Sequence, residues 1–188
     1  MKKDIYHPPG GILIWVIIFV ETITFSMGIL AYSYMRSKNV ELFNSSQMTL
    51  EKGLATINTI VLLTGGFLMA MGIQDLKKGL NKQSARWILG AILTGILFLI
   101  IKGSEYGIKL EHGHDLRENL FFTYYWLLTA FHFIHVFVAV VILTALYFSV
   151  KKGKYTSENY FDVETGGAFW HMCDLIWLML FPVLYLLH

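Results

Sequence analysis

Cysteine, proline and charge are scarce in this chain of 188 residues, which has one cysteine, three prolines and 15% charged residues. The single thiol, Cys173, excludes an intrachain disulfide and any zinc or iron–sulfur site held by cysteines alone. Hydrophobic residues make up 55% of the sequence, and its 15% of charged residues falls below the roughly 25% of an ordinary soluble domain. The chain therefore has too little polar surface to be such a domain. We therefore expect the lipid bilayer to be the surrounding medium.

The sequence also lacks the motifs of several functional classes. Its formal net charge is only +2, and no basic face with interleaved aromatics is visible, so nucleic-acid binding has no support. No glycine-rich phosphate loop, nucleophile elbow or zinc-protease helix is present. A self-contained enzyme that acts on a soluble substrate is therefore not expected.

Hydrophobic runs long enough to cross a bilayer occur five times. A spanning helix needs about 20 predominantly apolar residues. The sequence predicts an all-α polytopic bundle that forms a single membrane domain over residues 1–188, with transmembrane helices at about 11–35, 54–73, 86–104, 120–149 and 167–187. Gly65 and Gly95 provide flat patches on which neighbouring helices can approach closely.

Lysine and arginine are distributed unequally on the two sides of these spans. The N-terminal side carries nine of them, namely Lys2, Lys3, Lys77, Lys78, Lys82, Arg86, Lys151, Lys152 and Lys154. The other side carries six, namely Arg36, Lys38, Lys52, Lys102, Lys109 and Arg117. Because positive loops favour the cytoplasmic side, we expect the N-terminus inside and the C-terminus outside.

Glu21 lies near the middle of the first expected span, where a charged carboxylate costs about 3 kcal/mol on insertion scales. The cost falls if the carboxyl is protonated, or if it faces a partner or water inside the bundle. Two interpretations follow. Glu21 either handles protons or a lipid headgroup, or it is a carboxyl that is hydrogen-bonded between helices.

His132 and His135 are three residues apart in the fourth expected span, so they project from the same side of that helix. Histidines at this spacing can ligate a metal or a haem. Membrane cofactor sites usually need matching ligands on a facing helix, however, and the only other intramembrane histidine is His171. We therefore favour hydrogen-bonding histidines over a metal or haem site.

The fifth expected span combines Glu164, His171 and Asp174. Glu164 opens it, where a carboxylate favourably meets the positive end of the helix dipole. Asp174 lies about 10 Å along the helix, below the membrane surface, and His171 is its expected partner. A proton relay and a pair that fixes helix packing are both possible roles. We favour the second, because no continuous polar path is visible.

These residues make the chain resemble subunit III of the haem–copper respiratory oxidases, the cytochrome c oxidase type. The spacing of the family's closing motif is kept by Glu164, Trp170, His171, Asp174 and Trp177. Its Thr-Gly-Phe-His-x-x-His-Val signature is similar to Thr129, Phe131, His132, His135 and Val136. The first span resembles the family helix with a carbodiimide-reactive carboxylate through Glu21, Phe25 and Ala31, and Glu105 with Tyr106 resembles the family's Glu-Tyr pair.

The resemblance implies an accessory subunit without haem, copper or another redox centre of its own. It implies packing against the haem–copper catalytic subunit I and other oxidase subunits, with haem and copper in those partners and phospholipid bound between helices. The implied role is to stabilise the catalytic subunit and to support proton uptake in aerobic electron transport. The implied site is a set of proton-supporting or interhelical polar residues, Glu21, Glu105, His132, His135, Glu164, His171 and Asp174, in a bacterial inner membrane.

Three alternatives accompany this interpretation. The chain lacks two N-terminal helices of the longer family members, and its segments 102–106 and 180–182 resemble the branch associated with bacterial nitric oxide reductase. An accessory subunit of such a reductase is therefore the first alternative. The second is a small proton-coupled transporter that uses Glu21 and Asp174, although five spans without a repeat disfavour it. The third is a membrane haem protein ligated by His132 or His135.

Overall fold

The computed structural model describes residues 8–187, which form helices and short connections without a strand. The helices are α1 (Gly11–Lys38), α2 (Val40–Met48), α3 (Lys52–Lys77), α4 (Asn81–Glu111), α5 (Leu120–Lys151) and α6 (Phe161–Phe181), and α6 continues into a π-helical turn, η1 (Pro182–Leu186). Within the described range, five helices are long and apolar enough to cross a membrane: α1, α3, α4, α5, and α6 with η1. The predicted all-α membrane bundle is confirmed.

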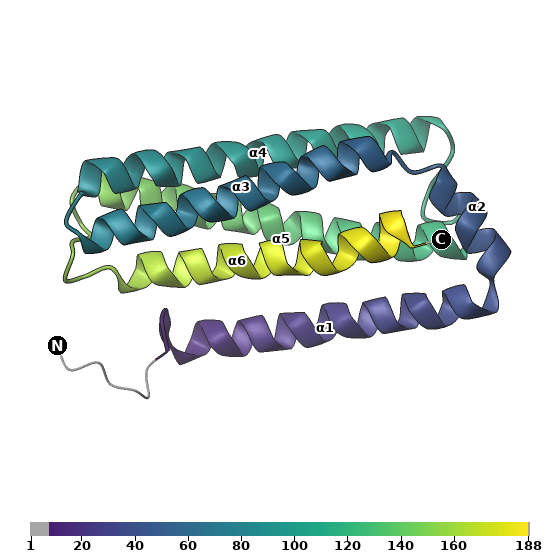
Figure 1. Ribbon diagram of the computed structural model, residues 1–188, viewed down its shortest axis with the longest axis horizontal. Helices are drawn as coiled ribbons and strands as arrows, with labels where there is room; N and C mark the ends of the chain where they lie inside the picture. The colour runs from purple at the N-terminus through teal and green to yellow at the C-terminus, as the bar shows by residue number, and fades with distance from the viewer. Residues whose placement is uncertain (1–7, 188) are drawn as a thin grey trace.

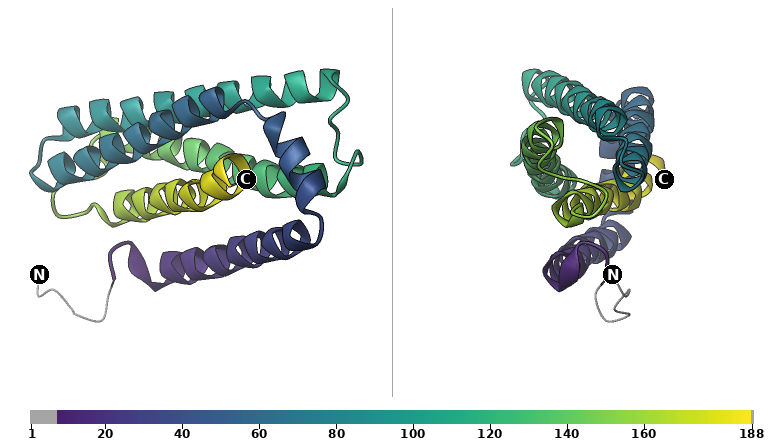
Figure 2. Two further views of the ribbon diagram at one scale, coloured as in Figure 1. Left: turned by 45° about the vertical axis from the view of Figure 1, so that its right-hand side comes forward. Right: turned by 90° about the vertical axis from the view of Figure 1, so that its left-hand side faces the viewer.

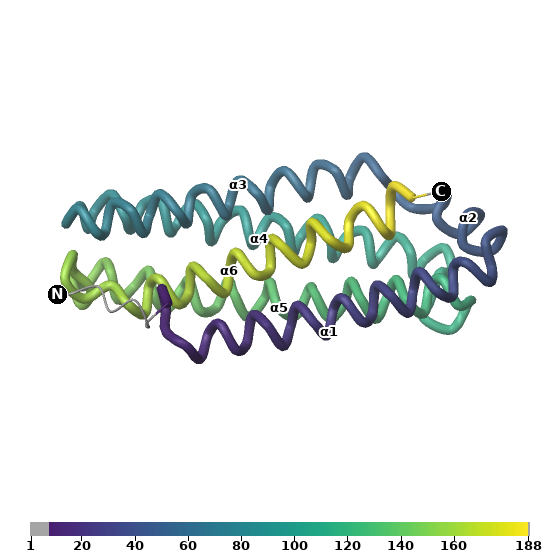
Figure 3. Tube along the Cα trace, turned by 60° about the horizontal axis from the view of Figure 1, so that its bottom comes forward, coloured from purple at the N-terminus to yellow at the C-terminus, as the bar shows by residue number. Residues whose placement is uncertain are grey.

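Helices α3 to α6 pack into a compact bundle, and α1 lies along one side of it (Figure 1). The end-on view in Figure 2 separates α1 from the other four helices, and Figure 3 shows it running beside α5 and α6. Only 11% of the most hydrophobic stretch of α1 is buried, compared with 50% in α6. Helix α1 therefore leaves most of its apolar surface open, whereas α6 is the central element.

The connections between the long helices follow ordinary helix-end chemistry. Gly79 and Gly113 follow α3 and α4 with φ angles of 78° and 80°, the left-handed conformation in which helices commonly end. Asn119 begins α5, and its side-chain oxygen accepts a hydrogen bond from the Phe122 amide at 3.0 Å. These local signals place the polar connections at the two ends of the bundle.

Helix α4 is longer than the expected span at 86–104. Its extra length changes the environment of two lysines that were counted among the charges of the outer side. Lys102 and Lys109, which the sequence pattern assigns to the outer-side charges, lie inside α4 and are 1% and 4% exposed. The helix continues through them because their ammonium groups have partners: Lys102 pairs with Glu105, and Lys109 donates to the Thr49 carbonyl at 2.9 Å. Lys2 and Lys3, counted on the other side, lie outside the described residues, so the orientation stays a prediction.

The core is closed by Trp170 of α6, which packs against glycines of two other helices. A Cβ atom at Gly65 in α3 or at Gly95 in α4 would lie 2.8 Å and 2.6 Å from the Trp170 ring. Both glycines therefore make room for one fully buried indole. This close approach explains why α3, α4 and α6 can share a single core layer.

Candidate functional site

Glu21 of α1 faces His135 of α5, and the carboxylate oxygen Oε2 lies 3.3 Å from the ring nitrogen Nε2. The other ring nitrogen, Nδ1, lies 2.8 Å from the Phe131 carbonyl, which can only accept, so Nδ1 carries a hydrogen. The Glu21 carboxylate and the His135 ring therefore face each other between α1 and α5, and Oε2 of Glu21 makes no hydrogen bond with the described residues.

His171 and Asp174 form a second pair, within α6. The distance between His171 Nδ1 and Asp174 Oδ2 is 3.5 Å, and the His171 side chain is 46% exposed whereas that of Asp174 is 9% exposed. A Cβ at Gly66 of α3 would collide with the Asp174 carboxylate. Gly66 thus opens the space that the pair occupies between α3 and α6.

We expect His171 and Asp174 to contribute jointly to stability. In a double-mutant cycle of His171→Leu and Asp174→Asn, the coupling should be about 0.2–0.5 kcal/mol, the usual value for two side chains three or four residues apart on one helix. The free energy of unfolding of the four variants, measured in mixed micelles, gives this value. Additive effects of the two substitutions would mean that the side chains do not interact.

His132 lies in the middle of the bundle and is fully buried. Neither of its ring nitrogens has a hydrogen-bond partner among the described residues. The ring is stacked on Trp177 at 5.2 Å, and Phe25 and Phe98 meet it edge-on. These three rings pack around the imidazole. The arrangement is that of a packed aromatic core, and it disfavours the haem hypothesis for this residue.

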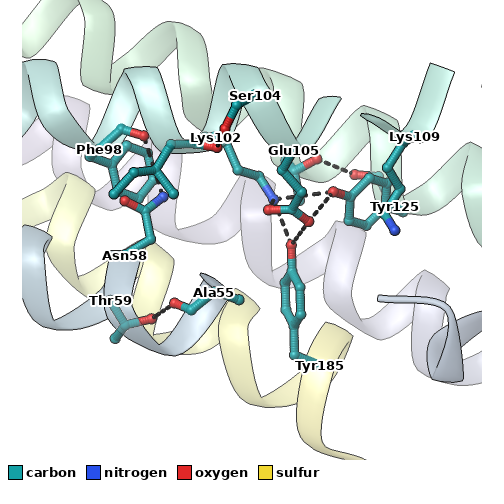
Figure 4. Close-up of polar contacts among 12 residues, drawn as sticks. Ala55, Asn58, Thr59, Phe98, Lys102, Ser104, Glu105, Lys109, Tyr125 and Tyr185 are labelled. Atoms are coloured by element: carbon teal, nitrogen blue, oxygen red, sulfur yellow. Dashed lines mark hydrogen bonds and ion pairs between the residues drawn. The ribbon is translucent and has the colours of Figure 1, made fainter. Parts of the chain in front are cut away.

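Glu105 belongs to a buried network that the sequence pattern does not predict (Figure 4). Its carboxylate lies 2.9 Å from the Lys102 ammonium and accepts hydrogen bonds from the hydroxyls of Tyr125 and Tyr185 at 2.7 and 2.8 Å. Lys102 also donates to both hydroxyls. All four residues are at most 2% exposed. One positive and one negative charge are thus sealed inside the protein with their hydrogen-bonding groups matched.

The Lys102 ammonium is further surrounded by aromatic faces. Its Nζ atom lies 5.0–5.3 Å from the ring centres of Tyr106, Tyr125, Trp177 and Tyr185. Such cation–π contacts help to replace lost hydration. We call Lys102, Glu105, Tyr125 and Tyr185 the lysine cage. It joins α4, α5 and η1.

The sequence contains a signal for this cage. Lys102 and Glu105 stand three residues apart, a spacing at which opposite charges on a helix can pair. The end of the apolar run nevertheless favours a loop position for Lys102 and an interfacial aromatic rim for Tyr125. The sequence cannot reveal that Tyr185, 80 residues after Glu105, completes the site.

Glu164 lies in the first turn of α6, and its carboxylate is 2.5 Å from the ammonium of Lys77 at the end of α3. The Lys77 side chain is 44% exposed, so this ion pair contributes little energy, although it links two helix ends.

The seven sequence-predicted residues therefore fall into the pair Glu21–His135, the pair His171–Asp174, His132, the lysine cage with Glu105, and the rim pair of Glu164. Phe25 packs against both His132 and His135, and Trp177 contacts both His132 and Lys102. Within residues 8–187, no group of three or more His, Cys, Asp or Glu side chains is arranged to hold a metal ion.

Comparison with known proteins places these features in a family. The model of the family described as cytochrome c oxidase subunit III matches residues 14–188. Cytochrome c oxidase subunit 3 of Thermostichus vulcanus is 30% identical over 183 residues, which cover 96% of this chain and 89% of the relative. The subunit 3 proteins of a Synechocystis species and of Lemur catta are 35% and 28% identical and are covered over 58% and 46% of their lengths. The chain thus spans nearly all of one relative and about half of the others.

Proposed function

The chain belongs to the cytochrome c oxidase subunit III family, and we propose that it packs beside the haem–copper catalytic subunit I of its oxidase in the inner membrane of a bacterium. As a subunit III it is an accessory subunit of a haem–copper oxidase and a multi-pass membrane protein that forms a complex with other oxidase subunits. In this proposal, haem and copper reside in the partners, phospholipid fills spaces between helices, and the chain stabilises the catalytic subunit.

The observation that carries the proposed packing is the exposure of His171. This side chain is 46% exposed, although it lies within α6, one of the helices long and apolar enough to cross a membrane. Polar side chains inside a span usually face a partner rather than lipid. We infer that the face of α6 beside α3 contacts the catalytic subunit.

The proposal is tested by purifying the tagged chain from its native membrane in a mild detergent. A catalytic subunit with a haem spectrum should be recovered with it in equal amounts, and His171→Leu should lower that recovery more than Leu175→Met on the same exposed face. Recovery without any haem–copper subunit would contradict the proposal. Oxygen and nitric oxide reduction by the recovered complex then distinguish an oxidase from the nitric oxide reductase alternative.

We also propose that Glu21 and His135, which face each other between α1 and α5, support proton uptake. Glu21→Gln is expected to leave the recovery of the complex unchanged, because an amide keeps the shape and hydrogen-bonding capacity of the carboxyl. It should nevertheless shorten the time for which the complex sustains turnover, relative to Glu158→Gln at an exposed position. Unchanged turnover would assign the pair to helix packing, and failure to assemble would indicate that the charge itself is required.

A further inference from the structure

The turn η1 that follows α6 is buried, although its own backbone bonding is weak. Pro182 begins it and has no N–H group to donate to the preceding turn. The Leu187 amide then donates to the Pro182 carbonyl at 3.1 Å, across five residues, which is the wide winding of a π-helix. Leu184 and Tyr185 are nevertheless both 0% exposed. Contacts with other helices must therefore hold η1 in place.

The first of these contacts is the hydroxyl of Tyr185 in the lysine cage. It donates to the Glu105 carboxylate at 2.8 Å and accepts a hydrogen bond from the Lys102 ammonium. Figure 4 shows Tyr185 reaching from η1 to these two charged groups of α4. Hydrogen bonds to charged groups are stronger than those between neutral groups, so this contact is a firm attachment of η1 to α4.

The second contact joins the neighbouring residue of η1 to α2. The side-chain amide of Gln47 donates to the Leu184 carbonyl at 2.9 Å, and Gln47 is 0% exposed. Without this acceptor a buried amide would be left unsatisfied, which is costly. Two consecutive residues of η1 thus bond to two different helices, Leu184 to α2 and Tyr185 to α4.

Helix α2 in turn positions the adjoining end of α1. Only Asn39 separates the two helices, with a non-helical φ of −136° and ψ of 48°. Tyr32 of α1 is 0% exposed and meets Phe43 of α2 edge-on at 5.2 Å. Figure 1 shows α2 crossing this end of the bundle from α1 toward α3, beside η1. Because the most hydrophobic stretch of α1 is only 11% buried, its placement depends on α2.

We propose that η1 is a latch that couples the lysine cage to the arrangement of α2 and α1. While Tyr185 occupies the cage, Leu184 offers its carbonyl to Gln47 and keeps α2 against the bundle. When Tyr185 leaves the cage, Gln47 loses its acceptor and α2 loosens, together with the last turn of α1. Helix α2 stays attached through the hydrogen bond from Asn119 to Ser46, so the release is partial.

The latch makes a reciprocal prediction, because two coupled contacts stabilise each other equally. Hydrogen–deuterium exchange of the full chain in mixed micelles, read by mass spectrometry, measures it. Tyr185→Phe removes one hydroxyl and should raise the exchange rate of the α2 amides and of the last turn of α1 roughly tenfold, the factor expected for a lost hydrogen bond to a charged group. Gln47→Leu leaves the cage intact and should raise the exchange rate of the amides at 183–187.

Tyr160→Phe is the matched control, because it removes the same atom where α6 begins, at the opposite end of that helix from η1. It should change exchange in neither segment, and α3, α4 and α5 should exchange as before in all three variants. Acceleration confined to η1 in Tyr185→Phe would overturn the proposal, since η1 and α2 would then be independent. An equal rise in Tyr160→Phe, or across α3 to α5, would show a general loss of stability instead.

Gln47→Leu also keeps the proposal testable if Tyr185→Phe does not fold. This substitution lies outside the lysine cage, so the ion pair keeps all its partners. Unchanged exchange at 183–187 in Gln47→Leu would contradict the latch.

Discussion

Glu105→Gln is expected to destabilise the protein by about 3–5 kcal/mol, the cost of removing one partner from a buried ion pair. The amide preserves the volume of the side chain but leaves the Lys102 charge without its counterion in a site that is 1% exposed. It also weakens the acceptor that both tyrosine hydroxyls use. The free energy of unfolding in mixed micelles measures the effect, and Glu158→Gln is the matched exposed control.

The companion variants separate charge from packing in the lysine cage. Lys102→Met should cost less than Glu105→Gln, because the remaining carboxylate keeps two hydroxyl donors. The double variant Lys102→Met/Glu105→Gln restores neutrality and should therefore be more stable than the sum of the single losses predicts. If Glu105→Gln were no more harmful than Glu158→Gln, the cage would not hold an ion pair.

Gly95→Ala is expected to destabilise the protein by about 1–3 kcal/mol, because overpacking forces neighbouring side chains to move. The added methyl would lie 2.6 Å from both Trp170 and Val140, and the Trp170 ring is fully buried and cannot yield. A methyl group at Gly107 in the same helix would meet no atom within 4 Å, so Gly107→Ala should be neutral or gain up to about 1 kcal/mol of helix propensity.

A compensating substitution checks the cause of this effect. Val140→Ala removes one of the two groups that meet the new methyl, so the double variant Gly95→Ala/Val140→Ala should recover part of the loss. The unfolding free energies of the four combinations provide the measurement. Loss of stability in Gly107→Ala that equals the loss in Gly95→Ala would instead indicate a general intolerance of α4 to alanine.

The sequence predicted the number and type of the spanning helices because length and hydropathy determine them directly. It predicted the pairing of His171 with Asp174 because both residues lie on one helix at a fixed spacing. It did not predict which helix Glu21 faces, since its contact with His135 depends on how α1 and α5 pack. The extension of α4 past residue 104 was missed for a related reason: in the sequence, a charge that is neutralised within a helix resembles a charge that ends it.

The position of each partner in the chain also bears on how the helices enter the membrane. Glu105 and Asp174 have partners three residues away on their own helices, so each can insert as part of a locally compensated pair. Glu21 differs, because its partner His135 arrives only with α5, after three further helices have been synthesised. An unpartnered carboxyl in hydrocarbon is costly. We therefore expect either that α1 remains beside the insertion machinery or that the Glu21 carboxyl stays protonated until α5 docks. The biogenesis of this subunit is thus linked to a contact between its first and its fourth spanning helix.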